Sequence, residues 1–251
     1  MSSSCHGRPG AIFPRGVQWM IFCLPFVVAG ILTWMKLFAS ETYIGLSGEG
    51  GILEGTQFVV YVSAAAVALR TLLFLAKSNR RCLRWLHVAL FLGLVFVALE
   101  EISWGQRIFG FKAPQELEIM NAQGETTLHN LRILQNYRDW LGASPLNLGY
   151  IAVGLYGGLG WLFLRFSKTG RGSPWSFVVP DWYCAPYFLA EALFFSVGEY
   201  FREGIEIGLP WLQWNEQESA ELLLALGFFI FALSNWRRAR ALVDADRDSR
   251  G

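Results

Sequence analysis

Six long apolar stretches dominate this sequence and restrict the folds open to it. They cover residues 17–38, 53–76, 85–103, 147–166, 183–201 and 218–236, and each is bounded by polar, Gly or Pro residues. A helix needs about 20 mostly apolar residues to cross the hydrocarbon core of a bilayer. Helices also satisfy their own backbone hydrogen bonds, which a bilayer interior requires. We therefore expect an all-α fold: a polytopic membrane helical bundle with six transmembrane helices.

The composition excludes several other classes of protein. Hydrophobic residues make up 53% of the 251 residues and charged residues only 16%, whereas soluble domains carry about 25% charged residues. The formal net charge of +1 offers no basic field for nucleic acid. A disordered chain, a nucleic-acid binder and an ordinary soluble enzyme are thus disfavoured, and the expected partner is the lipid bilayer.

The basic residues between the stretches predict the orientation. Most Lys and Arg lie before the first span, between the second and third, between the fourth and fifth, and after the sixth. The positive-inside rule assigns these segments to the cytoplasm. We expect cytoplasmic tails at 1–16 and 237–251, with both termini inside, around a membrane domain at 17–236. The short loops lead us to expect a bacterial inner (plasma) membrane.

The connection at 104–146 is the longest and falls on the outer side in this scheme. Loops of this length usually carry function or structure of their own. The pattern predicts one short helix over 114–122, a break at Gly124 and a second helix over 125–141. Apolar and polar residues of the second segment separate onto two faces at helical spacing. We expect it to be an amphipathic helix at the outer membrane interface.

The fourth span carries a pair of glycines at helical spacing, Gly154-x-x-x-Gly158. Small residues at this spacing let two membrane helices approach closely. The pair predicts tight packing of this span inside the bundle.

Glutamates are placed as unevenly as the basic residues. None of them lies in a predicted cytoplasmic segment. An ionisable group inside a bilayer is unfavourable by about 3 kcal/mol on insertion scales. The presence of several glutamates near the outer ends of the spans therefore needs a functional or structural explanation. We expect six of them to line a carboxylate-rich cavity open to the outer leaflet: Glu54, Glu100, Glu101, Glu199, Glu218 and Glu221. Glu191 falls near the middle of its span, where it is either a neutral group that hydrogen-bonds between helices or a proton or cation site.

The densest polar run follows the third span. If it is helical, Glu100, Trp104 and Arg107 share one face, and Arg107 can pair with a carboxylate. Glu100-Glu101 resembles the start of the Glu-Glu-x-x-x-Arg motif of membrane proteases of the CAAX-processing class. Gly105 stands where that motif has Arg, and the later spans contain no His, so we assign no family.

Glu125-x-x-x-His129 is the second candidate motif. On a helix the two side chains would lie on one face, about 6 Å apart along the axis. Such a pair can ligate a metal or act as a base and its partner. Glu101, Glu125 and His129 are the expected ligands of a divalent metal, while the structural alternative for His129 is a surface helix position.

Together these features favour a membrane-embedded enzyme, a hydrolase or transferase, that acts on a lipid or lipid-linked substrate. The expected catalytic residues are Glu100, Glu101, Arg107, Glu125, His129 and Glu199. Two alternatives stay open. The first is an ion- or proton-coupled transporter that uses Glu191 and Glu199, and the second is a non-catalytic subunit of a larger complex. The sequence leaves the oligomeric state open.

Overall fold

The computed structural model describes residues 12–48, 51–76, 80–136, 144–166, 174–200 and 216–248. Within these ranges the chain is helical, and the β-type pairing found there is one isolated bridge between Asn121 and Leu131. The long helices are α1 (Arg15–Phe38), α3 (Ile52–Leu75), α4 (Arg81–Glu101), α8 (Pro145–Phe166) and α10 (Glu216–Asp248). The shorter ones are α2 (Ser40–Ser47), α5 (Gln106–Phe109), α6 (Gln115–Met120), α7 (Arg132–Asn136) and α9 (Ala185–Tyr200).

Five helices of the described chain are long and apolar enough to cross a membrane: α1, α3, α4, α8 and the 217–245 part of α10. They contain the first four predicted spans and the last, apart from a residue or two at their ends. The all-helical expectation is confirmed, and the five helices indicate an integral membrane protein.

The fifth predicted span, 183–201, corresponds to α9, whose described part is shorter than the other long helices. As described, α9 has 16 residues, which gives a length of about 24 Å against a hydrocarbon core of about 30 Å. The helix packs against α8 and α10, and Tyr187, Phe188 and Ala192 are buried. It is a core element of the bundle, so its apolar sequence does not by itself make it a span.

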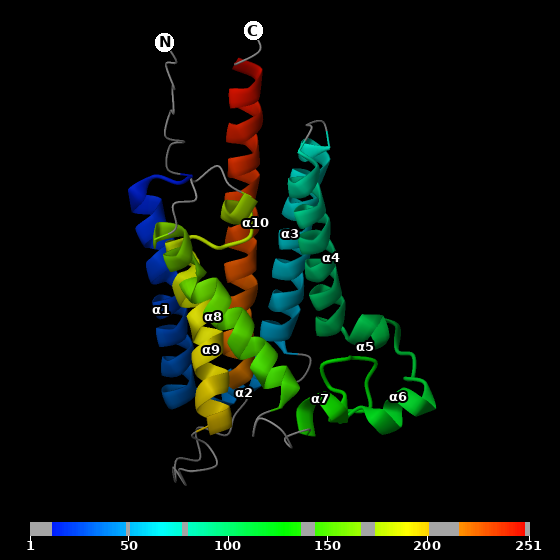
Figure 1. The fold of residues 1–251 in the computed structure, drawn as a ribbon. Coiled ribbons are helices and arrows are strands. Elements are labelled where there is room, and N and C mark those ends of the chain that lie inside the picture. Colours follow the sequence, from blue (N-terminus) through cyan, green and yellow to red (C-terminus); the bar gives the residue numbers. More distant parts are fainter. Residues whose placement is uncertain are drawn as a thin grey trace, which may run out of the picture.

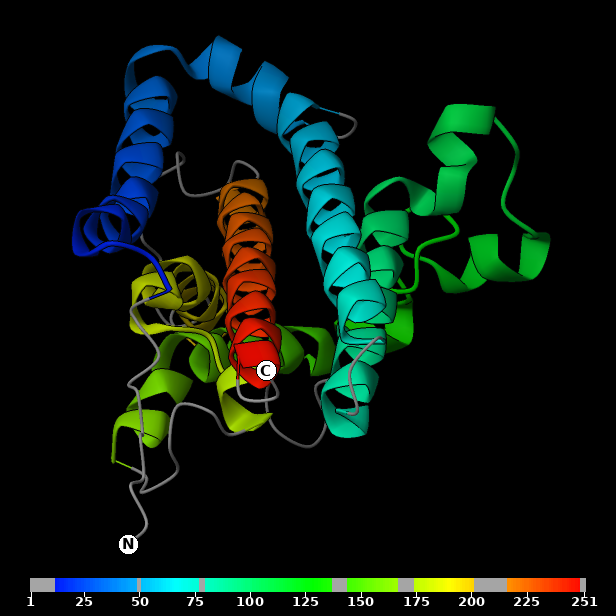
Figure 2. The same cartoon turned by 90° about the horizontal axis from the view of Figure 1, so that it is seen from above.

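Helix α10 occupies the middle of the bundle. Figure 2 shows it surrounded by α1, α2, α3, α8 and α9. In the most apolar 18-residue stretch of α10, 61% of the residues are buried. The corresponding share in α1 is 11%, so most side chains of α1 face outward. Helix α10 also runs to Asp248, so the segment after 236, expected as a tail, continues as helix.

The ends of the helices fall into two groups. The start of α1, the end of α3, the start of α4 and the end of α10 lie toward the top of Figure 1, and α5, α6 and α7 lie toward the other end. At the top, Arg238 of α10 pairs with Asp181, which also accepts a hydrogen bond from Tyr183. This pair ties α10 to the turn that precedes α9.

The glycines of α8 pack against α9 as the sequence predicts. Gly154, Gly157 and Gly158 are buried, and a Cβ atom at Gly154 would lie 2.7 Å from the backbone nitrogen of Ala192 and from the carbonyl oxygen of Phe188. Two helices can approach this closely only without a side chain at the contact.

The outer segment differs from the expectation. Helix α6 begins after Pro114, as predicted, but the second predicted helix is wrong over 125–131, which is irregular. Gly124 has a left-handed φ of +69°, and the Asn121 side chain donates to the carbonyl of Thr127 (2.8 Å). Side chains that bond to nearby backbone compete with helix formation. Helical structure resumes in α7, and 137–143 lie outside the described residues.

Replacing Gly154 by Ala is expected to destabilise the protein, because the new methyl group meets backbone atoms of α9 that cannot rotate away. Overpacking of this kind is unfavourable by about 1–3 kcal/mol. Thermal unfolding in detergent measures the effect. Gly149→Ala is the matched control, because no atom lies within 4 Å of the Cβ position there. Equal melting temperatures for the two variants would contradict the packing described.

Candidate functional site

The candidate site begins at an unusual turn that ends α4. After Glu101 the backbone takes left-handed conformations at Ser103 (φ +50°), Trp104 (φ +54°) and Gly105 (φ +87°). Residues other than Gly adopt this conformation at a cost of about 1–2 kcal/mol each, so two in succession must be held by other contacts. The turn brings the Trp104 indole back to Glu100, although the helical face predicted for Glu100, Trp104 and Arg107 is broken here.

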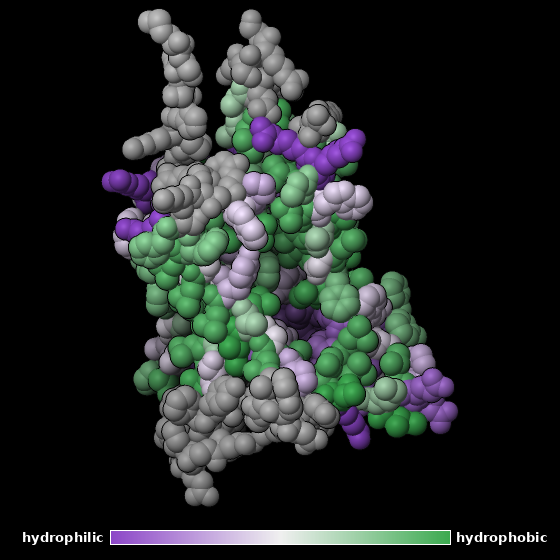
Figure 3. Space-filling view, in the orientation of Figure 1, coloured by the Kyte–Doolittle hydropathy of each residue, from purple (hydrophilic) through white to green (hydrophobic). Residues whose placement is uncertain are grey.

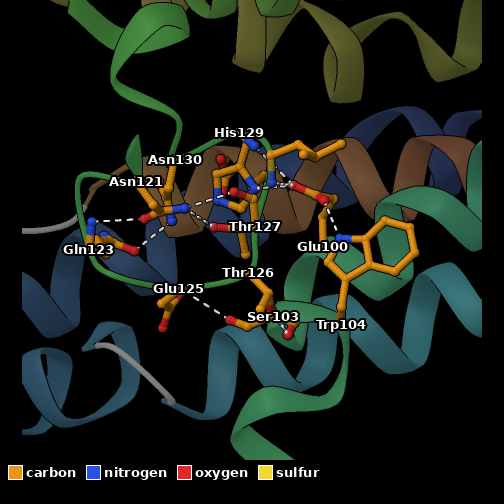
Figure 4. Close-up of polar contacts among 12 residues, drawn as sticks. Glu100, Ser103, Trp104, Asn121, Gln123, Glu125, Thr126, Thr127, His129 and Asn130 are labelled. Carbon is orange, nitrogen blue, oxygen red and sulfur yellow. Dashed lines mark hydrogen bonds and ion pairs between the residues drawn. The ribbon is translucent and has the colours of Figure 1, made fainter. Parts of the chain in front are cut away.

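Four N–H groups surround the Glu100 carboxylate, whose side chain is 7% exposed. Oε1 accepts from the indole Nε1 of Trp104, and Oε2 accepts from the backbone N–H groups of Leu128 (2.8 Å) and His129 (3.0 Å). Oε2 also bonds to Nδ1 of His129 at 2.9 Å. Figure 4 shows these bonds converging from both sides of the carboxylate. A buried carboxylate needs such donors, because its charge is otherwise unsolvated.

The bond to Glu100 orients the imidazole of His129. A carboxylate can only accept here, so Nδ1 carries a proton. Burial lowers the pKa of His129, but the hydrogen bond to Glu100 and the charges of Glu100, Glu221 and Glu125 act more strongly in sum and raise this pKa above its ordinary value of 6.5. The ring is thus held in one orientation, and its protonated form is more stable than that of an unpaired imidazole.

A second set of contacts fastens the outer segment to the end of α4. Ser103 Oγ donates to Glu125 Oε2 (2.9 Å), Thr126 Oγ1 donates to the Ser103 carbonyl, and the Thr126 N–H donates to Gln106 Oε1 (2.9 Å). Glu125 and His129 are therefore placed by separate contacts with the α4 turn. The prediction that they share a helical face is wrong, because their segment is not helical.

A loop network holds this segment in shape. The Asn121 side chain, buried to 1% exposure, donates to Thr127 and accepts from the N–H of Gln123 (2.9 Å). The Asn130 side chain donates to the side-chain oxygen of Gln123. The backbone carbonyl of Asn130 accepts from the Ala122 N–H (2.8 Å). The two backbone N–H groups that bind Glu100 lie between Thr127 and Asn130, both members of this network, so the network fixes their position (Figure 4).

Further carboxylates lie beside this pair, inside the bundle. Glu221 of α10 interacts electrostatically with His129 and is hydrogen-bonded by Gln217 (2.7 Å) and Tyr150. Glu191 of α9 interacts with Glu221 and with Glu101. Helices α4, α9 and α10 thus bring three acidic groups to one region, as the sequence predicts for Glu101 and Glu221.

Glu191 differs from the other carboxylates. It is fully buried, and neither carboxylate oxygen has a hydrogen-bond partner within the described chain. A buried polar group without partners is unfavourable, so such a group in a folded protein usually has a role.

The structure brings some predicted site residues together and leaves others untested. Glu100 and His129 are in direct contact, Glu125 interacts with His129, and Glu101 lies with the bundle carboxylates. Arg107 and Glu199 belong to α5 and α9, but their side chains lie outside the described part of the chain. Among the described residues, no group of three or more His, Cys, Asp or Glu side chains is arranged to hold a metal ion, so the metal ligation by Glu101, Glu125 and His129 stays a prediction.

Sequence reasoning missed several residues that shape the site. Tyr61 of α3 and Tyr150 of α8 interact with the bundle carboxylates. Tyrosines are common in membrane helices, so no local signal separates these two from ordinary ones. The sequence predicts Trp104 on the face of Glu100, but not that its indole N–H donates to the Glu100 carboxylate.

Comparison with known proteins does not assign this helical membrane protein to a family. No family model, no curated protein and no solved structure matches the chain. Its function must be argued from the site itself.

The stability that His129 contributes is expected to depend on pH. Because folding raises the pKa of His129, its contribution is present in full below about pH 6.5 and is lost as the pH rises through the raised pKa. The melting temperature of the wild type should exceed that of His129→Gln most near pH 6, and the difference should shrink toward pH 9. Glu116→Gln, an exposed change on α6, is the control and should follow the wild type. A difference that does not vary with pH would contradict the charged pair.

Proposed function

We propose that this protein is a membrane-embedded hydrolase or transferase for a lipid or lipid-linked substrate, with His129 as its proton acceptor and Glu100 as the residue that orients it. The observation that supports the proposal is the bond between His129 Nδ1 and Glu100 Oε2 (2.9 Å), placed beside a group of carboxylates inside an apolar bundle. A carboxylate that fixes an imidazole is the usual arrangement of a general base.

The proposed chemistry uses the second ring nitrogen of His129. With Nδ1 held by Glu100, Nε2 takes a proton from water or from an acceptor hydroxyl as its oxygen attacks an ester or phosphoester. The same nitrogen then returns the proton to the leaving oxygen. The raised pKa of His129 suits this return step, because it favours the protonated ring. Glu101 and Glu221 lie where they can bind the polar part of a substrate or the attacking water.

The shape of the molecule supports an amphiphilic substrate. Figure 3 shows a hollow with a hydrophilic lining on an otherwise hydrophobic face, between α8 and α4 as labelled in Figure 1. Glu101 and Glu221 are partly exposed although they belong to the bundle. A lipid could place its headgroup in this hollow while its chains stay in the bilayer.

The proposal includes the finer topology: six spans, with both termini in the cytoplasm of a bacterial cell and the site toward the outer leaflet. Alternating spans put the helix ends at the top of Figure 1 on the cytoplasmic side and α5–α7 on the outer side. Basic residues at the first group of ends support this orientation.

A pair of engineered cysteines tests the topology. Lys112→Cys and Ala241→Cys place a thiol at exposed positions, in a variant without the four native cysteines. On intact spheroplasts a membrane-impermeant maleimide should label position 112, and label position 241 only after permeabilisation. If α9 does not cross the bilayer, both positions lie on one side and label together, which would contradict six spans.

Catalysis is tested with purified protein in mixed vesicles of phosphatidylethanolamine, phosphatidylglycerol and cardiolipin, plus short-chain ester and phosphoester analogues. Mass spectrometry follows product formation. His129→Gln and Glu100→Gln should lower kcat by about 10²–10⁴-fold, the usual contribution of a general base. The matched control, Glu116→Gln, should retain full activity. Turnover by the wild type that survives in His129→Gln would sink the proposal, and elemental analysis of the same preparations tests the metal prediction.

Glu191 favours one second candidate, a proton-coupled transporter. Its buried carboxylate, unpartnered among the described residues, is the type of group that binds and releases a proton in transporters. Proton flux into liposomes that is abolished by Glu191→Gln, together with no turnover of the substrates above, would favour transport over catalysis.

A further inference from the structure

A groove at the end of the molecule opposite the site runs between the last turn of α3 and the first turns of α4. It is an open pocket of about 470 Å³ lined by Leu72, Ala76, Arg81, Arg84, Trp85 and Val88. On α4, Arg81, Arg84 and Val88 follow one another at spacings of three and four residues, so they face one side of the helix. The groove therefore has apolar walls and two guanidinium groups, and none of its described lining residues is acidic.

The two arginines lie at the N-terminus of α4, where positive charges destabilise a helix. Arg81 is the first residue of α4, and Arg84 follows within its first turn, which holds no acidic residue. The N-terminus of a helix carries a partial positive charge, so cations there are unfavourable by about 0.3–1 kcal/mol each. Helix stability thus does not account for the pair, and an anion bound between them would offset the repulsion.

The position of Trp85 indicates how deep in the bilayer the groove lies. Its side chain is 72% exposed, next to the arginines and near the end of a membrane-spanning helix. Exposed tryptophans at span ends lie at the level of the lipid headgroups. A ligand that reaches the groove at this depth comes from the bilayer itself.

We propose that this groove binds the headgroup of an anionic phospholipid. Arg81 and Arg84 hold the phosphodiester, because guanidinium groups match the geometry of phosphate oxygens. Leu72, Ala76 and Val88 contact the upper part of an acyl chain. In the proposed orientation the groove faces the cytoplasmic leaflet, where anionic lipids attract basic residues. The site is separate from Glu100 and His129 and does not depend on the proposed reaction.

Native mass spectrometry of the full chain, titrated with dioleoyl phosphatidylglycerol or dioleoyl phosphatidylcholine, tests the proposal. The wild type should retain phosphatidylglycerol in preference to phosphatidylcholine. Arg81→Gln/Arg84→Gln should weaken binding of phosphatidylglycerol by about 30-fold, since each basic residue near anionic lipid contributes about 1 kcal/mol.

The matched control is Arg15→Gln/Arg165→Gln. It removes the same charge from two exposed positions at the ends of α1 and α8, on the same side of the bundle. This variant should bind phosphatidylglycerol like the wild type. Equal weakening in both double variants would show attraction to general positive charge and would overturn the proposal, as would a wild type without lipid preference.

A second measurement needs no change at the arginines. Brominated lipids quench tryptophan fluorescence on contact, and the difference between the wild type and Trp85→Phe isolates the signal of Trp85. Brominated phosphatidylglycerol should quench this signal more strongly than brominated phosphatidylcholine at equal mole fraction. Equal quenching by the two lipids would also overturn the proposal.

Discussion

The buried carboxylate of Glu100 is the contact on which the arrangement of the outer half of the molecule depends. At this depth water cannot solvate the charge, so protein N–H groups must do so. The donors come from Trp104 on one side and from Leu128 and His129 on the other. One acidic group thus joins the end of α4 to a loop more than 20 residues further along the chain. The left-handed turn at Ser103–Gly105, the irregular path of 125–131 and the orientation of the imidazole all serve this contact.

The other acidic groups of the bundle are satisfied to different degrees. Glu221 has Gln217 and Tyr150 as partners, whereas both oxygens of Glu191 are without a hydrogen bond in the described chain. Glu221, which interacts with His129, thus has hydrogen-bond partners, whereas Glu191, in the protein core, has none among the described residues. Polar groups inside a membrane bundle are retained where they have a task, which is the basis for the function proposed for this set.

The two ends of the bundle differ in chemistry. The end with α5–α7 gathers carboxylates around one imidazole, and the opposite end presents arginines, a tryptophan and an ion pair between Asp181 and Arg238. Between them the helices expose apolar side chains, most completely on α1. This division is consistent with the proposed orientation across a bilayer, with the proposed reactive site at the acidic end and the proposed lipid site at the basic end.

The sequence by itself determined the helical class, the long apolar helices and the close packing of α8 inside the bundle, because these follow from local composition and spacing, whereas the structure identified α9 as the helix that α8 packs against. It also identified Glu100, Glu101, Glu125 and His129 as candidates, since charged groups at the end of an apolar span are rare. Only the tertiary structure decided that His129 meets Glu100 rather than sharing a helical face with Glu125. It also decided that the described part of α9 packs against α8 and α10 in the core of the bundle and that Tyr61 and Tyr150 interact with the carboxylates. Those outcomes depend on hydrogen bonds and packing between segments far apart in the chain, which local periodicity does not encode.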